Sequence, residues 1–209
     1  MTNRVIAIGD IHGCSLALGT LIDIIQPDSA DTVVTLGDYI NRGPDGRGVI
    51  DQLIGLRDRC KYFPLLGNHD QLLLLNRSSR TETLGHLRTD EESGLELFRD
   101  EHFGFLESCS LYFENDTHFF VHANYEEKKQ LAQQDDYTLL WLSLNVRMPK
   151  RHCSRKTAIV GHTSQRNGEI LERRHLKCID TYCYGGGWLT AIDVCTNQIW
   201  QVDRFGSVR

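Results

Sequence analysis

The sequence predicts an α/β fold whose functional side chains lie where buried strands end. Three observations predict it: short apolar and β-branched runs recur along the chain, a Gly-Asp or Gly-Asn pair follows each of the first three, and a histidine follows two later ones. Short apolar runs bounded by turn residues are typical of buried strands. Open α/β folds bind ligands beyond the carboxyl ends of their strands. We therefore expect these polar side chains to meet at one edge.

The expected elements follow in chain order. The first three strands occupy residues 4–8, 32–36 and 62–66, and each stops at a glycine that permits a sharp turn. Apolar residues 72–75 and the partly helical spacing within 94–106 predict helices that flank a polar loop, and we expect a substrate-side insertion around 76–105. Two later strands, 119–121 and 158–161, lead into His122 and His162. Residues 179–181 and 190–194 predict two strands around a Gly185–Gly187 turn.

Six strand-end side chains offer metal ligands: Asp10, His12, Asp38, Asn68, His122 and His162. Carboxylate and amide oxygens and neutral imidazoles are suitable donors for hard or borderline divalent ions. Singly, each residue is as well explained by a helix cap, a turn or a core histidine. Jointly, their order and spacing favour a two-metal hydrolase, because two ions about 3.5–4 Å apart can hold a phosphoryl group and generate hydroxide.

The ordered motifs GDIHG (9–13), GDYINRG (37–43), GNHD (67–70), VHAN (121–124) and GHT (161–163) resemble the PPP family of metallophosphatases. The similarity is strongest to compact bacterial and phage serine/threonine phosphatases and to the related symmetrical diadenosine tetraphosphatases, and it runs from Val5 to about Val194. The resemblance implies the metallo-dependent phosphatase fold: two packed mixed β-sheets flanked by helices, with a dinuclear metal site at strand ends. We expect residues 1–209 to form a single metallophosphoesterase domain.

The resemblance also implies a role for each motif residue. Asp10 and His12 correspond to ligands of one metal, and Asp38 to the carboxylate that bridges both. The second metal is then held by Asn68, His122 and His162. His69 corresponds to the general acid and Arg42 to the phosphate clamp, whose planar fork suits phosphate oxygens. The implied reaction is in-line attack by a metal-bridging hydroxide. The donor set suits Mn²⁺ best, with Fe, Zn²⁺, Co²⁺ and Ni²⁺ as alternatives.

Two positions depart from the phosphatase pattern. Asn41 stands where protein phosphatases usually carry an Asp that supports the histidine acid. Asn41 can still hydrogen-bond His69 as a catalytic partner, but it has no charge to stabilise an imidazolium, so we expect weaker acid catalysis. Diadenosine tetraphosphatases commonly lack this Asp too. Ser143 stands where bacterial relatives often have a second phosphate-binding Arg, and nearby Arg147, Lys150 and Arg151 are possible substitutes.

Composition limits the setting and the partners. A net charge of −5 argues against a nucleic-acid surface, which requires clustered Lys and Arg. No apolar run approaches the roughly 20 residues of a membrane span. The seven scattered cysteines contain no C-x-x-C pair, and no leader precedes the first strand, so we expect a reducing cytoplasm. Nothing in the composition indicates an oligomeric state.

The main functional prediction is a metal-dependent phosphomonoester hydrolase, a serine/threonine protein phosphatase acting on a phosphorylated protein or small phosphoester. The first alternative is a hydrolase of diadenosine tetraphosphate, a phosphoanhydride, which Asn41 and Asp70 favour. The second alternative is a metal-binding protein with weak or lost catalysis.

Overall fold

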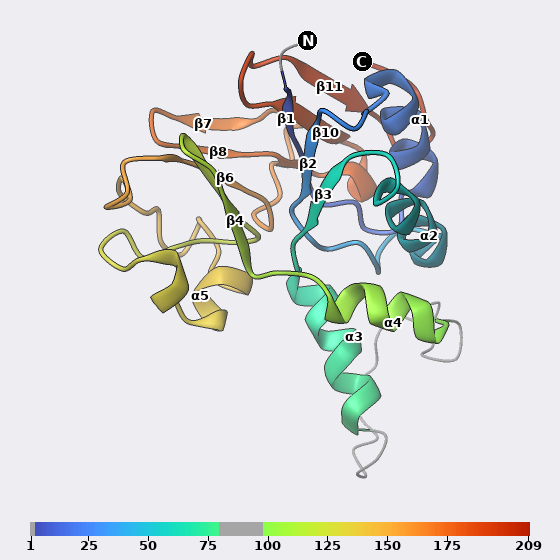
Figure 1. Cartoon of the computed structure of the whole chain (residues 1–209), viewed down its shortest axis with the longest axis horizontal. Coiled ribbons are helices and arrows are strands. Elements are labelled where there is room, and N and C mark those ends of the chain that lie inside the picture. The colour runs from blue at the N-terminus through green and yellow to red at the C-terminus, as the bar shows by residue number, and fades with distance from the viewer. Residues whose placement is uncertain (1–2, 80–97) are drawn as a thin grey trace.

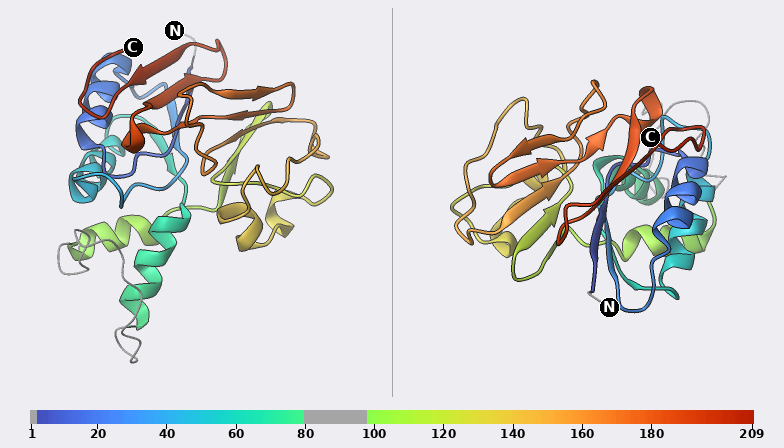
Figure 2. Two further views of the ribbon diagram at one scale, coloured as in Figure 1. Left: turned by 180° about the vertical axis from the view of Figure 1, so that it is seen from behind. Right: turned by 90° about the horizontal axis from the view of Figure 1, so that it is seen from above.

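Two β-sheets face one another in this computed structural model, which describes residues 3–79 and 98–209 (Figures 1 and 2). The six-stranded sheet has the order β11-β10-β1-β2-β3, with β9 paired to β10. Its strands are β1 (Val5–Ile8), β2 (Thr32–Thr35), β3 (Lys61–Pro64), β9 (Asp180–Thr181), β10 (Trp188–Asp193) and β11 (Ile199–Val202). The five-stranded sheet has the order β4-β5-β6-β8-β7. Its strands are β4 (Tyr112–Glu114), β5 (His118–Val121), β6 (Thr157–Val160), β7 (Leu171–Arg173) and β8 (Leu176–Cys178).

Both sheets are mixed, as predicted. In the first, β1, β2 and β3 run parallel, with Val5 opposite Thr32 and Thr32 opposite Lys61, while β10 runs antiparallel to β1. In the second, β5, β6 and β8 run parallel and the edge strands β4 and β7 are antiparallel to their neighbours. The parallel strands bring the motif-bearing ends of β1, β2 and β3 together, and likewise those of β5 and β6.

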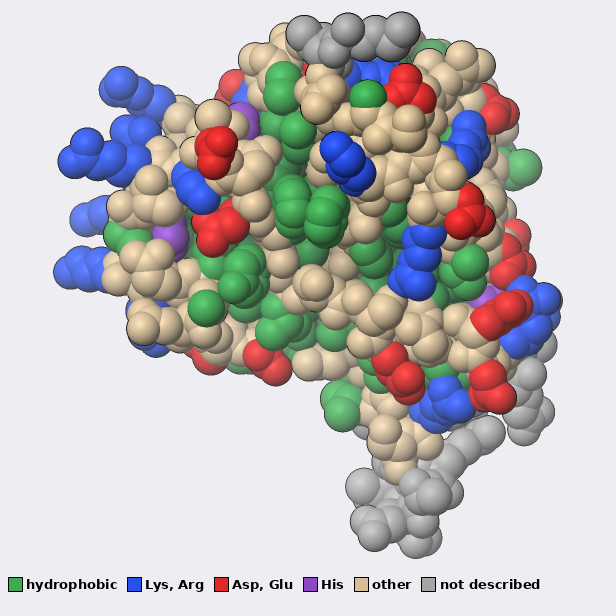
Figure 3. Space-filling model, viewed as in Figure 1, with side chains coloured by type: hydrophobic (Ala, Val, Ile, Leu, Met, Phe, Trp, Pro, Cys, Tyr) green, Lys and Arg blue, Asp and Glu red, His purple; other side chains and the backbone are tan. Residues whose placement is uncertain are grey.

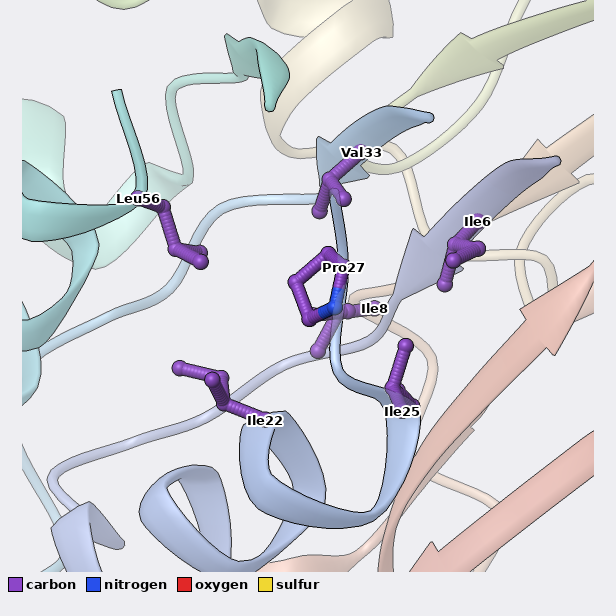
Figure 4. A pocket seen from close by; sticks show the side chains of 7 residues that line it. All are labelled: Ile6, Ile8, Ile22, Ile25, Pro27, Val33 and Leu56. Carbon is purple, nitrogen blue, oxygen red and sulfur yellow. The ribbon is translucent and has the colours of Figure 1, made fainter. Parts of the chain in front are cut away.

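Helices α1 (Ser15–Ile25) and α2 (Gly46–Leu56) cover the outer face of the six-stranded sheet (Figure 2). The buried side chains of α1 recur at helical spacing, so one face of the helix packs on the sheet. A small apolar pocket of about 10 Å³ lies at this interface. Figure 4 shows the side chains that line it. Its lining comes from both helices, from β1 and β2 and from Pro27, and consists of Ile6, Ile8, Ile22, Ile25, Pro27, Val33 and Leu56.

A second apolar layer joins the two sheets. Ala7 and Val34 from one sheet belong to the same buried cluster as Phe120 and Ile159 from the other. The outer face of the five-stranded sheet is covered by the segment that carries a 3₁₀ turn (Leu131–Gln133) and the short helix α5 (Asp136–Leu140). This apolar layer fixes the two sheets relative to each other. It thereby also fixes the positions of the side chains that follow the carboxyl ends of the strands.

The predicted insertion around 76–105 falls partly within α3 (Asn68–Ser79) and α4 (Asp100–Glu107), and residues 80–97 lie outside the described part. Figure 1 shows α3 projecting away from the sheets with α4 beside it. Arg77 joins them: it pairs with Asp100 at 2.8 Å and its guanidinium lies 4.1 Å from the Phe103 ring centre. Phe103 itself is buried in the main core.

The expected boundaries differ slightly from the observed ones. Strands β1 and β2 match the first two predicted strands within one residue, and β3 is displaced by one to two residues. The helix expected to start near residue 72 begins at Asn68, which places both Asn68 and His69 in its first turn. The two strands predicted in the carboxy-terminal region are present as β9 and β10, which pair antiparallel and are separated by a 3₁₀ turn at Cys183–Gly185. Within the described residues, no helix is long and apolar enough to cross a membrane.

Candidate metal centre and active site

The six predicted ligands converge between the carboxyl ends of the two sheets. Asp10 and His12 follow β1, Asp38 follows β2, and Asn68 opens the helix after β3. His122 and His162 follow β5 and β6 of the other sheet. Among the described residues, three groups of side chains have atoms close enough together to bind a metal ion, and two of them lie here: His12, Asp38 and His69, and Asp38, His122 and His162.

Asp38 belongs to both groups and lies between them. Its Oδ2 lies 3.4 Å from His12 Nε2, and its Oδ1 lies 3.5 Å from His122 Nε2. The side chain is 3% exposed. Each carboxylate oxygen therefore faces a different imidazole, which is the arrangement required of a ligand that bridges two ions.

Asn68 occupies the second group with its amide oxygen directed inward. Its Oδ1 lies 3.0 Å from His122 Nε2 and 2.9 Å from His162 Nδ1. Asp10 contacts the same segment: the His162 backbone N–H donates to Asp10 Oδ2 at 2.9 Å. One amide oxygen and two imidazole nitrogens thus meet at one point, a donor set that suits a divalent ion.

Backbone carbonyls orient the three histidines. His12 Nδ1 lies 3.1 Å from the Ile40 carbonyl and His122 Nδ1 lies 2.8 Å from the Leu36 carbonyl, so both rings donate through Nδ1 and present Nε2 to Asp38. His162 is turned the other way: its Nε2 donates to the Trp141 carbonyl at 3.1 Å and its Nδ1 faces Asn68. Such contacts fix the tautomer and leave one nitrogen free on each ring for a metal.

The electrostatics also fit a cation. Burial lowers the pKa of His12 and of His122 to about 4 each. Burial opposes ionisation of Asp38, but the imidazoles of His122 and His12 outweigh it and lower the pKa of its carboxyl to about 2. At neutral pH the site therefore holds neutral imidazoles and an ionised carboxylate, the forms that bind metal. Burial and the neighbouring Asp180 and Asp38 raise the pKa of Asp10, a repulsion that a divalent ion would relieve.

The loops that hold these side chains have unusual backbone conformations. His12, Asp38, Asn41, Arg42 and His162 all have positive φ, between 47° and 68°. Non-glycine residues rarely adopt this region, and such strain is concentrated at functional sites. The adjacent glycines are required by close packing: a Cβ at position 161 would collide with the Asp10 carboxylate, and one at position 67 with the Asp38 backbone.

His69, Asn41 and Arg42 lie together beside the ligand cluster. Asn41 Nδ2 donates to His69 Nδ1 at 3.2 Å, while Asn41 Oδ1 is buried without a described hydrogen-bond partner. Arg42 Nη2 lies 3.4 Å from His69 Nε2. The His69 ring is in edge contact with His12 at 5.0 Å, and its backbone N–H donates to Asp38 Oδ1 at 2.9 Å. The predicted acid, its partner and the phosphate clamp therefore occupy one corner of the site.

Family comparison is consistent with this geometry. The model of the calcineurin-like phosphoesterases matches residues 3–187, which is most of the chain. The chain belongs to the calcineurin-like phosphoesterase family. It is therefore placed among phosphoesterase hydrolases, which use divalent metals, and the predicted fold class and family resemblance are confirmed.

Several relatives of this phosphoesterase carry the name symmetrical bis(5'-nucleosyl)-tetraphosphatase. The protein from Acidovorax sp. (strain JS42) is 40% identical over 102 residues, covering 45% of this chain and 36% of the relative. The protein from Janthinobacterium sp. (strain Marseille) is 32% identical over 135 residues, covering 61% of this chain and 46% of the relative. The aligned regions thus span less than half the length of these relatives.

Solved structures show the same fold. One described provisionally as a diadenosine tetraphosphatase has a TM-score of 0.74 at 23% identity, covering 97% of this chain and 94% of that one. A protein serine/threonine phosphatase from Saccharomyces cerevisiae has a TM-score of 0.61 at 13% identity, covering 92% and 73%. At these identities, the likeness establishes the fold alone.

Two buried carboxylates of this phosphoesterase have a structural importance that motif reading did not assign. Asp70 accepts hydrogen bonds from the backbone of Asp38 (2.8 Å), Tyr39 (3.0 Å) and Gly67 (3.0 Å), and so holds the Asp38 loop. Burial and the Asp38 charge raise the pKa of Asp70 to about 8. Asp180 anchors the segment after His162, as described below. The GNHD motif contains Asp70, but no local signal shows which backbone groups it binds.

The basic segment after Trp141 has partners away from the metal ligands. Arg147 pairs with Glu127 at 2.6 Å, and Arg151 donates to the Arg155 carbonyl at 2.7 Å. Figure 3 shows Lys and Arg side chains projecting from the edge of the molecule that carries the loop between α5 and β6. Ser143, which has no charge, forms a hydrogen bond between its hydroxyl and that of Thr163 at 3.3 Å. These contacts support the interpretation of the segment as a solvated loop.

Proposed function

We propose that this phosphoesterase hydrolyses a phosphoanhydride bond in a dinucleoside tetraphosphate or a closely related nucleotide. The observation that carries the proposal is that relatives of 32–40% identity bear the name of this activity. Asn41 is consistent with it, because a phosphate leaving group is a far weaker base than an alkoxide and needs less help from an acid. The initial expectation of a protein phosphatase is therefore ranked below its alternative.

We assign the following roles to the side chains of the candidate site. Asp10, His12, Asp38, Asn68, His122 and His162 would hold two divalent ions, with Mn²⁺ as the proposed metal. Ions bound there would supply charge neutralisation and lower the pKa of water. Arg42 binds phosphate oxygens through two parallel N–H donors, which fixes the phosphorus for in-line attack. His69 donates a proton to the leaving oxygen. Its ring is held in place by Asn41, which donates a hydrogen bond to His69 Nδ1.

Phosphomonoester hydrolysis is the second candidate, favoured by His69. Its Nε2 lies 3.4 Å from the Arg42 guanidinium, so a proton donor stands next to the proposed phosphate-binding group. An alkoxide leaving group from phosphoserine or phosphothreonine requires such a donor. A metal-binding protein without efficient chemistry ranks third, because all six proposed ligand positions carry suitable donors that lie together.

The deciding experiment measures Mn²⁺-dependent turnover of diadenosine tetraphosphate and of a phosphoserine peptide side by side. Asp38→Asn protein is the control for contaminating activity. We expect cleavage of the nucleotide, lost in the variant, with little release from the peptide. Release from the peptide alone would establish the second candidate. Bound metal with activity on neither substrate would leave the binding protein as the function.

A further inference from the structure

A strip of aromatic rings leads away from the metal-ligand cluster and carries a guanidinium at each end. Tyr184 lies against the cluster, with its ring centre 4.9 Å from that of His12. The Arg42 guanidinium lies 5.0 Å from the Tyr184 ring centre. Tyr182 follows at 4.8 Å in edge contact with Tyr184, and the Arg166 guanidinium lies 5.5 Å from the Tyr182 ring centre. The two arginines thus border one continuous surface.

Buried Asp180 connects the two loops that form the strip: residues 162–166, and the loop between β9 and β10 that carries Tyr182 and Tyr184, here called the tyrosine loop. Its Oδ2 accepts from Ser164 Oγ at 2.7 Å, its Oδ1 from the Tyr182 backbone at 3.1 Å, and its carbonyl from the Gln165 backbone at 2.8 Å. Asp180 is 2% exposed. The segment that begins at metal-ligand candidate His162 and continues to Arg166 is therefore held directly against the tyrosine loop.

The tyrosine loop is shaped to keep this arrangement. Tyr182 has a φ of 66°, and a Cβ at position 185 would collide with its ring, so a larger residue there would displace the ring. Arg204 also supports the loop by donating to the Tyr184 carbonyl at 3.2 Å. The strip is consequently a fixed surface next to the site.

Arg42 and Arg166 are both exposed, and neither forms an ion pair with a carboxylate of the described residues. Other exposed arginines do: Arg147 pairs with Glu127 and Arg209 with Glu169, each at 2.6 Å. An arginine that stacks on an aromatic face keeps its N–H donors directed to the sides, where a phosphate can accept them.

We propose that Arg166 binds the phosphate groups beyond the scissile one and so selects substrates with several phosphates in series. This proposal rests on the proposed function and deepens it. A substrate with a single phosphate engages Arg42 alone, whereas a polyphosphate chain extends along the strip to Arg166. Arg166 would then supply the second guanidinium that Ser143 does not provide, from a position unrelated to the basic loop.

Binding of two inorganic probes tests the proposal without depending on turnover. Calorimetry would measure Kd for tripolyphosphate and for orthophosphate at constant free Mn²⁺, in wild-type and Arg166→Ala protein. We expect the tripolyphosphate Kd to rise about tenfold in the variant, as for one lost charge-assisted hydrogen bond. The orthophosphate Kd should not change, which also shows that the variant is folded.

Two further variants separate a specific contact from general charge. Arg166→Lys keeps the charge without the planar fork and should recover part of the affinity. Arg151→Ala removes an exposed guanidinium from the basic loop and should leave both Kd values unchanged. An equal effect of Arg166→Ala on both probes, no effect on either, or an equal loss in Arg151→Ala would overturn the proposal.

The same data distinguish the subsite from the proposed function. Selective loss of tripolyphosphate binding in Arg166→Ala, together with wild-type protein that leaves diadenosine tetraphosphate intact, would retain the subsite and refute the activity. Cleavage of the nucleotide with unchanged tripolyphosphate binding would do the reverse.

Discussion

Asn41 is the residue of the candidate site that we expect to affect the chemistry most. It donates to His69 through Nδ2 and leaves Oδ1 buried without a described partner. An asparagine can present either its nitrogen or its oxygen to the ring, whereas an aspartate can only accept and also stabilises a protonated imidazole by charge. We therefore expect the residue to affect acid catalysis more than binding.

Asn41→Asp should raise turnover of phenyl phosphate, whose leaving group needs a proton, by about tenfold, a modest share of the 10²–10⁴ attributable to general acids. Turnover of diadenosine tetraphosphate should change little. Steady-state kinetics with both substrates would measure this, with Asn41→Ala as the control that removes the hydrogen bond altogether. An unchanged rate on phenyl phosphate would show that Asn41 already supports His69 adequately.

The buried histidines should make the metal-free protein sensitive to acid. The pKa of His122 is lowered by burial from 6.5 to about 4 in the folded chain, so its stabilising contribution is present above pH 6.5 and is lost as the pH falls towards 4. The loss is of the order of 3 kcal/mol for this residue. In urea unfolding with a chelator present, His122→Gln should show a flatter decline of the unfolding free energy between pH 6.5 and 4. Parallel wild-type and variant curves would contradict this.

Within single elements, the spacing of apolar residues determines which segments form strands and helices. The conformations of the loops depend instead on contacts with distant parts of the chain. Helix α1 has two leucines that separate burial from helix propensity: Leu18 is 0% exposed against the six-stranded sheet, and Leu16 is 66% exposed. The same substitution at both sites therefore isolates the contribution of packing.

Leu18→Ala should lower the free energy of unfolding by about 2–5 kcal/mol, because it removes buried methyl groups and leaves a cavity. Leu16→Ala should change it by no more than about 0.5 kcal/mol. Denaturant unfolding of the two variants would measure the difference. Similar losses at both positions would mean that α1 is stabilised mainly by local helix propensity.

On the scale of the whole molecule, the candidate metal centre joins the two sheets. Asp10, His12, Asp38 and Asn68 come from the six-stranded sheet and its connections, while His122 and His162 come from the five-stranded sheet. Ions bound to both sets would link the sheets at their carboxyl ends, in addition to the apolar layer behind them. Metal binding should therefore be a global stabiliser.

Free Mn²⁺ at 100 times its Kd should stabilise the fold by about 2.7 kcal/mol, which corresponds to a rise in Tm of about 5–10 °C. Thermal unfolding with and without metal would show the rise, and a chelator should reverse it. Asp38→Asn protein, without the shared carboxylate charge, should show much less of this shift. An equal shift in that variant would place the stabilising metal elsewhere.

The sequence by itself determined the order of the strands along the chain, the candidate ligands at their ends and the family, because apolar runs and Gly-Asp turns are local signals. Only the tertiary structure decided how these parts act together. The tautomers of His12, His122 and His162 depend on carbonyls from other loops, and the hold of Asp70 on the Asp38 loop depends on a turn after β3.

The strip from Arg42 to Arg166 likewise joins residues more than a hundred positions apart. No local pattern encodes it, because it arises from two loops that the packed sheets and buried Asp180 bring together. Short-range periodicity specifies which segments form strands and which residues end them. Contacts between distant loops exist only once the core has packed, and they determine the orientation, charge and reach of the site.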